Sequence, residues 1–234
     1  NFEEVSFGPI LYGAKKLGMH IHTRYEVSNN AGQDICDIVN NEGFDFLLVG
    51  SGISMSDSPD DIAATRYRTS FYNRYFKRFK APESWFYPGA LLKDKTKMFI
   101  ARSNCDVGVF INRNFVKATN TLVVISSEED LFLLDYTRTL LKATHGSVGI
   151  VAKMSTTTPG HDQILKELWD FVSSIPQTQL LPDKDLTPGL FNSYNFMLIG
   201  YNTWNDVSEH RKEALQKMPS TLILNKNKRS SSDN

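Results

Sequence analysis

The sequence predicts an α/β protein made of two related units, each with a mostly parallel sheet flanked by helices. Three observations support this fold class: helix and strand patterns alternate, the strands are apolar runs, and one strand pattern occurs twice. Continuous apolar strands are typical of parallel sheets that helices cover on both faces. With 41% hydrophobic and 22% charged residues, the chain has enough apolar material for a core, which excludes wholesale disorder.

Outside the insertion, the first half contains two expected helices and three expected strands. The first helix has an apolar stripe at helical spacing and stops near Gly18. Its stripe consists of Phe7, Ile10, Leu11, Ala14 and Leu17. An alternating strand is expected at 20–27, a turn at 29–32, and a second helix around Ile35, Ile38 and Val39. Apolar strands are expected at 44–49 and 105–112.

The second half repeats the same order of elements. Strands are expected at 121–126, 147–154, 179–181, 195–201 and 221–225, with a Pro/Gly turn region at 182–189. Ser127 and Asp130 form a capping box that predicts a helix to about residue 143. A helical stripe follows at Ile164, Leu168, Phe171, Val172 and Ile175. Asp206 and Glu209 are expected to cap a last helix that runs to Met218.

An internal repeat defines the expected domains. Residues 44–50 match residues 194–200 in their apolar run and closing glycine. From Gly50 to Val109 is 59 positions and from Gly200 to Ile223 is 23, so the first copy has an excess of 59 − 23 = 36 residues. We therefore predict a first unit at 1–115, truncated at its N-terminus and with an insertion at about 57–93, a second unit at 116–226, and a disordered tail at 227–234.

Composition excludes several function classes. Lys+Arg and Asp+Glu balance at 26 each, so net charge favours neither nucleic acid nor an acidic partner. Cys36 and Cys105 form no disulfide framework and no zinc motif, and no apolar run approaches a membrane helix in length. His20 and His22 alternate with Ile21, so they would share one strand face. Because no third ligand stands at metal-binding spacing, we expect ordinary strand histidines and no metal.

The chain begins at Asn1 rather than Met, and we therefore expect it to be a piece of a larger protein.

The repeated β-α order, with a Gly that closes the fourth strand, resembles the universal stress protein fold. A more specific match is the strand Cys-Asp-Val-Gly-Val-Phe-Ile-Asn-Arg at 105–113, followed by the strand at 121–126 and the acidic turn at 127–130. This order resembles the cytosolic C-terminal domain of monovalent cation/proton antiporters, of the fungal K+/H+ antiporter type and similar to plant cation/proton exchangers. The resemblance covers most of 1–225, except the insertion.

The resemblance implies a non-catalytic regulatory or structural domain that acts in potassium and pH homeostasis and needs no cofactor. Its partner would be the transmembrane antiporter domain of the same polypeptide, which these 234 residues lack, at the cytosolic face of an endomembrane such as the Golgi or endosome. A homodimer is a further expected partner arrangement. The alternative, from another class, is a soluble tandem universal stress protein that binds or slowly hydrolyses a nucleotide.

Any small ligand is expected at the carboxyl ends of the parallel strands. The candidate residues are Gly50, Ser51, Gly52, Ser126, Ser127, Glu128, Gly200 and Asn202. Nucleotide-binding stress proteins carry a Gly-x2-Gly-x9-Gly-Ser/Thr loop, whose backbone N–H groups cradle phosphate. The residues after Gly50 and after Gly200 depart from this loop, so we expect no ATP binding tighter than about millimolar.

The insertion combines a basic helical face with an aromatic one, over a helix expected at 60–80. Its basic face consists of Arg66, Arg74, Lys77, Arg78 and Lys80. We favour an aromatic face that packs on protein and a solvated basic face. An anionic membrane surface is the next interpretation, and a nucleic acid is the partner that we expect least.

Overall fold

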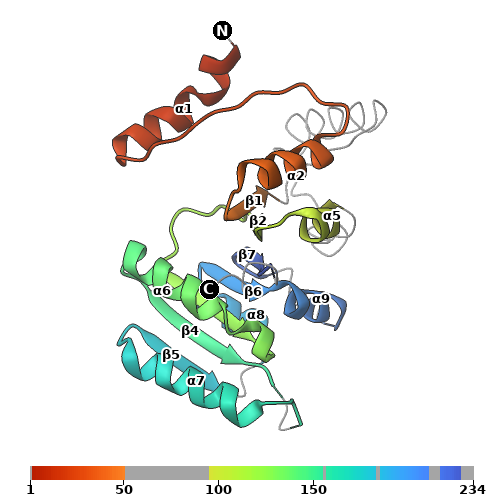
Figure 1. Ribbon diagram of the computed structural model, residues 1–234. Coiled ribbons are helices and arrows are strands. Elements are labelled where there is room, and N and C mark those ends of the chain that lie inside the picture. The colour runs from red at the N-terminus through yellow and green to blue at the C-terminus, as the bar shows by residue number, and fades with distance from the viewer. Residues whose placement is uncertain (1, 51–94, 155–156, 183–184, 211–216, 228–234) are drawn as a thin grey trace, which may run out of the picture.

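The computed structural model describes residues 2–50, 95–154, 157–182, 185–210 and 217–227. Within these ranges the strands form one seven-stranded sheet, in the order β1-β2-β7-β6-β3-β4-β5 (Figure 1). The strands are β1 Phe46–Gly50, β2 Asp106–Ile111, β3 Asn120–Ile125, β4 Ser147–Ala152, β5 Thr178–Pro182, β6 Phe196–Gly200 and β7 Ser220–Asn225. Every pairing is parallel except β2 with β7. The predicted fold class, α/β with a mostly parallel sheet flanked by helices, is confirmed.

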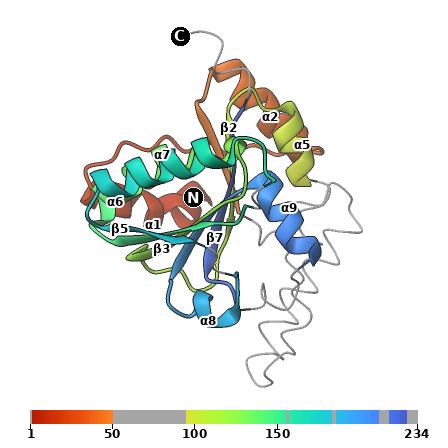
Figure 2. The ribbon, with the colours of Figure 1, turned by 90° about the horizontal axis from the view of Figure 1, so that it is seen from below.

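Helices cover both faces of the sheet. They are α1 Phe2–Lys16, α2 Ala31–Glu42, α5 Lys95–Arg102, α6 Leu133–Thr144, α7 His161–Ser174, α8 Pro188–Phe191 and α9 Tyr201–His210, with a 3₁₀ turn at Glu128–Asp130. Helices α6 and α7 lie on one face, whereas α5 and α9 lie on the other (Figure 2). The two resulting apolar layers enclose β3 after its exposed first residue, Asn120, because Leu122, Val123, Val124 and Ile125 are all fully buried.

The cap residues of α2 show why the sequence folds locally as expected. Asn30 lies just before the helix, and its side-chain oxygen accepts a hydrogen bond from the N–H of Gln33 at 3.2 Å. Gly43 ends the helix with a φ of 69°, in the left-handed region that glycine adopts without a steric cost. The expected helix around Ile35 and Val39 is therefore confirmed, with a capped beginning and end.

The antiparallel pair β2–β7 joins the strands of the two predicted units. Val109 lies opposite Ile223, and these are the residues that the repeat aligns with one another. A two-fold axis between two like units would pair equivalent residues in this way. The register therefore agrees with the internal repeat, while the domain boundaries themselves stay a prediction. Asn227, the first residue of the expected tail, donates from its backbone N–H to Asp106 Oδ1 at 2.8 Å, and 228–234 lie outside the described residues.

Two sequence predictions are wrong. Residues 20–27 were expected to form a strand but adopt no regular secondary structure. A strand needs a neighbour for its backbone hydrogen bonds, and the described sheet offers none there. The last helix, expected to begin near Asp206, begins at Tyr201, directly after β6. Its buried face consists of Thr203, Trp204 and Val207, whose helical spacing starts earlier than the acidic residues taken for a cap.

Candidate functional site

The carboxyl ends of β3 and β6 lie side by side at the centre of the sheet. Val124 pairs with Ile199, so Ser126 and Gly200 follow at neighbouring positions. Helix α9 starts at Tyr201, and the 3₁₀ turn at Glu128–Asp130 starts two residues after Ser126. Both predicted ligand-binding stretches of the second unit are thus brought together. The edge where parallel strands open toward solvent is also where α/β folds bind ligands.

The side chain of Asp130 fills this position. It is 2% exposed, and its Oδ2 atom accepts hydrogen bonds from the Ser126 N–H at 2.9 Å and the Ser127 N–H at 3.2 Å. The hydroxyls of Ser126 and Thr203 both lie within hydrogen-bond distance of the same oxygen, at 3.2 Å and 2.6 Å, and of one another. Because each hydroxyl has one proton, one of them donates to the carboxylate while the other can donate either to the carboxylate or to its fellow hydroxyl. Polar groups from the end of β3, the acidic turn and α9 therefore converge on one internal carboxylate.

Gly200 is the other half of this arrangement. A Cβ atom at this position would lie 1.9 Å from Asp130 Oδ1, so only glycine allows the strand end to approach the carboxylate so closely. The contact places an anionic side chain at the first turn of α9. The N-terminus of a helix attracts negative charge, and a bound phosphate would use the same place. Asp130 therefore takes the N–H groups and the space that a phosphate would need.

The surroundings of the carboxylate are acidic and exposed. Glu128 points to solvent, and Glu129 accepts a hydrogen bond from the Asn202 side-chain amide at 2.8 Å. Lys153, which follows β4, forms an ion pair with Asp206 of α9 at 3.6 Å, so its charge is already matched. A phosphate group entering here would meet three acidic residues, which disfavours nucleotide binding electrostatically. The serine and threonine hydroxyls serve Asp130, which suits a structural role.

Of the candidate residues predicted in the first unit, the structure describes only Gly50. Gly50 ends β1 and is exposed, but Ser51 and Gly52 lie outside the described residues, as does the whole expected insertion with Arg66, Arg74, Lys77, Arg78 and Lys80. Two central residues were missed as site residues. The sequence predicts Asp130 only as a capping-box residue, and that motif is the signal by which Asp130 could be recognised as part of the site. Thr203 gives no comparable signal, because only the fold brings it to Ser126.

A second polar contact joins α6 to β2. The Tyr136 hydroxyl donates to Asp106 Oδ2 at 2.8 Å, and its ring lies 5.9 Å from the ring of Phe46, measured between centroids. Burial raises the pKa of Tyr136 above its ordinary value, and the hydrogen bond to the Asp106 carboxylate and the charge of that group raise it further. The phenol therefore stays neutral and acts as a hydrogen-bond donor that ties the two parts of the sheet together.

His20 and His22 are exposed and belong to no strand. Within the described ranges, no three His, Cys, Asp or Glu side chains are grouped as metal ligands would be. Cys36 and Cys105 are buried, and burial raises the pKa of both thiols. The helices of the described residues are all too short or too polar to cross a membrane.

The arrangement of strands and helices is similar to that of solved structures of other proteins. A universal stress protein from Archaeoglobus fulgidus DSM 4304 matches with a TM-score of 0.55 and 11% identity, over 97% of this chain and 77% of that one. This is a universal stress protein-like fold. A putative universal stress protein from Pseudomonas aeruginosa UCBPP-PA14 matches with a TM-score of 0.49, and a protein of unknown function from Pseudomonas aeruginosa PAO1 with 0.48.

The two Pseudomonas structures are each 10% identical to this chain and are matched over 96% of it, and over 79% and 78% of their own lengths. No protein-family model matches the sequence, and neither does any curated protein. The similarity therefore establishes the universal stress protein-like fold, and the activity has to be argued from the residues of this chain.

Proposed function

We propose that this chain is a non-catalytic regulatory and structural domain on the cytosolic side of a K+/H+ antiporter. One observation carries the non-catalytic part of this proposal. The buried carboxylate of Asp130 uses the N–H groups of Ser126 and Ser127 and fills the space beside Gly200. A crevice that is closed by its own side chain supports a packing role rather than nucleotide turnover.

The antiporter part rests on the order of motifs at 105–113, 121–126 and 127–130. These stretches correspond to β2, β3 and the acidic turn, and β2 and β3 lie on either side of the neighbouring pair β7 and β6. In this role the domain would contact the transmembrane domain of its own polypeptide, at the cytosolic face of a Golgi or endosomal membrane. A homodimer and an anionic membrane surface at the basic face of the insertion are further proposed partners.

The alternative, a stand-alone tandem universal stress protein that binds a nucleotide, is favoured by the match to the Archaeoglobus fulgidus protein over 97% of this chain. Isothermal titration with ATP separates the two functions. For a domain closed by Asp130, we expect no binding tighter than about 1 mM, which corresponds to about 4 kcal/mol of association. Micromolar binding by the wild-type chain would contradict the proposal and support the alternative.

A pair of variants tests whether the Asp130 carboxylate is what prevents ATP from binding. Asp130→Ala removes the carboxylate and frees the N–H groups of Ser126 and Ser127, so its affinity for ATP should rise above that of the wild type. Asp170→Ala removes an exposed carboxylate from α7 and should leave the affinity unchanged. Equal affinities for the two variants would show that Asp130 does not control access to the crevice.

The transport role needs the natural polypeptide. Potassium-dependent decay of a pH gradient, measured in endomembrane vesicles, should be lost when the gene is deleted. When only residues 1–234 are deleted, we expect exchange to persist with altered regulation. Vesicles that exchange potassium for protons equally well without the gene would contradict the antiporter role.

A further inference from the structure

Among the strands that the structure describes, β1 is paired on one side only, whereas its repeat counterpart β6 is paired on both. Within the described residues β1 stands at the end of the sheet beside β2, and β6 lies between β7 and β3. Leu48 of β1 is 57% exposed, although the repeat aligns it with Leu198 of β6, which is 2% exposed. The same apolar strand pattern is thus buried in one half and open to solvent in the other.

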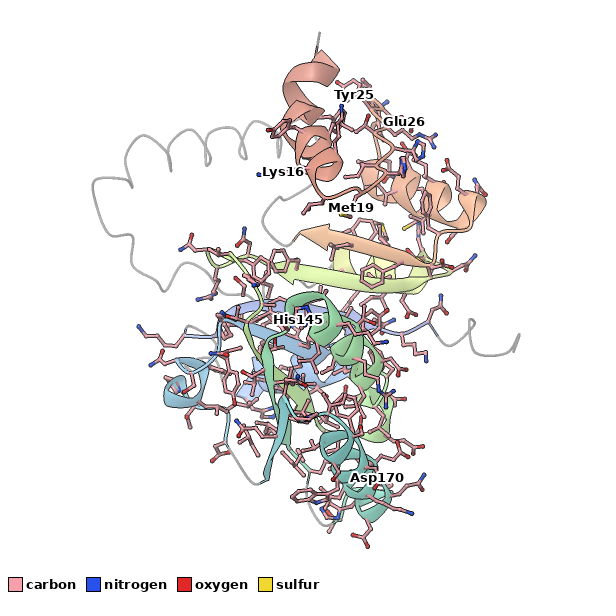
Figure 3. All side chains as sticks on the ribbon, turned by 90° about the vertical axis from the view of Figure 1, so that its left-hand side faces the viewer. Lys16, Met19, Tyr25, Glu26, His145 and Asp170 are labelled. Carbon is pink, nitrogen blue, oxygen red and sulfur yellow. The ribbon has the colours of Figure 1, made fainter. Side chains whose placement is uncertain are left out.

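The segment before β1 is open as well. Ile10 of helix α1 is 54% exposed and Leu17, directly after the helix, is 74% exposed, although both belong to the apolar stripe of this segment. It lies beyond the β1 end of the sheet, and the extended segment with Met19 and Tyr25 runs from it toward α2 (Figures 1 and 3). The exposed large apolar side chains of this region are Ile10, Leu11, Tyr12, Leu17, Met19, Ile21, Tyr25, Val27, Phe44 and Leu48. Single exposed apolar residues are common, but so many in one region indicate a surface that binds protein.

Comparison of the order of elements shows which elements of the second half have no counterpart in the described first half. Its chain order is β3, α6, β4, α7, β5, α8, β6, α9, β7, and the first half has α1, an extended segment, α2, β1, α5, β2. Aligning β1 with β6 aligns α2 with α8 and α1 with α7, and it aligns residues 20–27 with the region of β5. The first half therefore has no described counterpart of Asn120–Ala152, the segment of β3, α6 and β4 that lies between β6 and β5.

We propose that the free edge of β1 binds a β-α-β segment of the same polypeptide, which leads into α1. Its first strand pairs in parallel with β1, and its second strand lies between the first and residues 20–27, which then complete the sheet as a strand. Its helix and α1 cover Leu48, as α6 and α7 cover the layer that contains Leu198. The segment has two short apolar strands, because strands enclosed on both faces are apolar.

The order of elements along the chain favours a segment of the same polypeptide, rather than a separate protein, as the partner of the β1 edge. In the second half α7 is the next element after β4, so the matching segment of the first half is expected to have α1 as its next element. The fold comparison is consistent with this, because 100 − 77 = 23% of the Archaeoglobus fulgidus protein has no counterpart in this chain. The inference does not depend on the proposed antiporter role, since a stand-alone tandem protein would need the same segment.

Cysteine labelling tests the proposal on the natural polypeptide and on the 234-residue chain. Leu48→Cys introduces a thiol on β1, and Val116→Cys introduces a control thiol at a position that is 92% exposed. The natural Cys36 and Cys105 are buried and should contribute a slow background. In the 234-residue chain, both introduced thiols should react with maleimide at similar rates. In the natural polypeptide, Leu48→Cys should react at least about tenfold more slowly, because labelling then requires local opening.

Amide hydrogen exchange of the wild-type proteins provides a second readout that needs no variant. Residues 20–27, and those amides of 47–50 that point away from β2, should exchange fast in the 234-residue chain and be protected in the natural polypeptide; the β1 amides that face β2 are paired in both proteins. Equal labelling and exchange in both proteins would overturn the proposal, as would a natural polypeptide with fewer than about 30 residues before Asn1, too few for a β-α-β unit. Protection that appears in the 234-residue chain only as it dimerises would assign the edge to a second copy instead.

Discussion

The segments that precede β1 and β6 have the same order of elements and different degrees of burial. Before β6, helix α7 buries Ile164, Leu168 and Phe171, and β5 pairs with β4. Before β1, helix α1 leaves most of its apolar stripe exposed, and residues 20–27 form no strand. The local patterns are comparable, so the difference lies in the neighbours. An alternating sequence becomes a strand only where another strand satisfies its backbone hydrogen bonds.

The largest expected effect is the difference in free energy of unfolding between a variant in α7 and a variant just after α1. Leu168→Ala in α7 removes a fully buried side chain and should lower the free energy of unfolding by about 2–5 kcal/mol. Leu17→Ala, just after α1, removes a side chain that is 74% exposed and should change it by less than about 0.5 kcal/mol. Urea unfolding measures both values. Similar losses for the two variants would show that the α1 region is packed in solution, contrary to the comparison.

Substitution by alanine should destabilise the protein at the glycine that closes β6 and have almost no effect at the glycine that closes β1. Gly200→Ala forces its new methyl group against Asp130 Oδ1, and we expect a loss of about 1–3 kcal/mol in the free energy of unfolding. At Gly50 a Cβ atom would meet no described atom within 4 Å, so Gly50→Ala should change stability by less than about 0.5 kcal/mol. Thermal or urea unfolding of the matched pair checks this. A neutral Gly200→Ala would mean that the Asp130 carboxylate is free to move away.

The smallest expected effect concerns the hydrogen bond that links α6, in the second half of the chain, to β2, in the first half. Tyr136→Phe removes the hydrogen bond from α6 to Asp106 of β2, and should cost about 1 kcal/mol at pH 7 to 8. Because the folded state raises the pKa of Tyr136, its stabilising contribution is complete below the ordinary tyrosine value of about 10 and decreases as the pH rises above it.

Unfolding of wild type and Tyr136→Phe at pH 8 and at pH 10.5 measures this contribution. The stability difference between the two proteins should shrink at the higher pH, where the unfolded wild type gains a phenolate that the variant cannot form. A difference that stays constant across this range would indicate that the hydroxyl lies in water and bonds Asp106 weakly.

The sequence determined the fold class and most element positions, because those depend on local patterns. Apolar runs predicted β1 and β6, Asn30 and Gly43 delimit α2, and the capping box located the turn at Ser127 and Asp130. The repeat also aligned Val109 with Ile223, which the sheet pairs directly. All of these signals act over a few residues or compare two similar stretches, so no knowledge of distant contacts is needed.

Only the tertiary structure decided which patterns are realised and what fills the candidate site. The Thr203 hydroxyl reaches Asp130 because β6 and β3 are neighbours, and no local spacing encodes an approach across 73 residues. Residues 20–27 have the alternation of a strand but no neighbouring strand in the described part of the chain, and Leu48 lies in an apolar run typical of a core strand but is exposed at the edge of the described sheet. Burial and strand pairing are properties of two or more segments together, and a single segment cannot specify them.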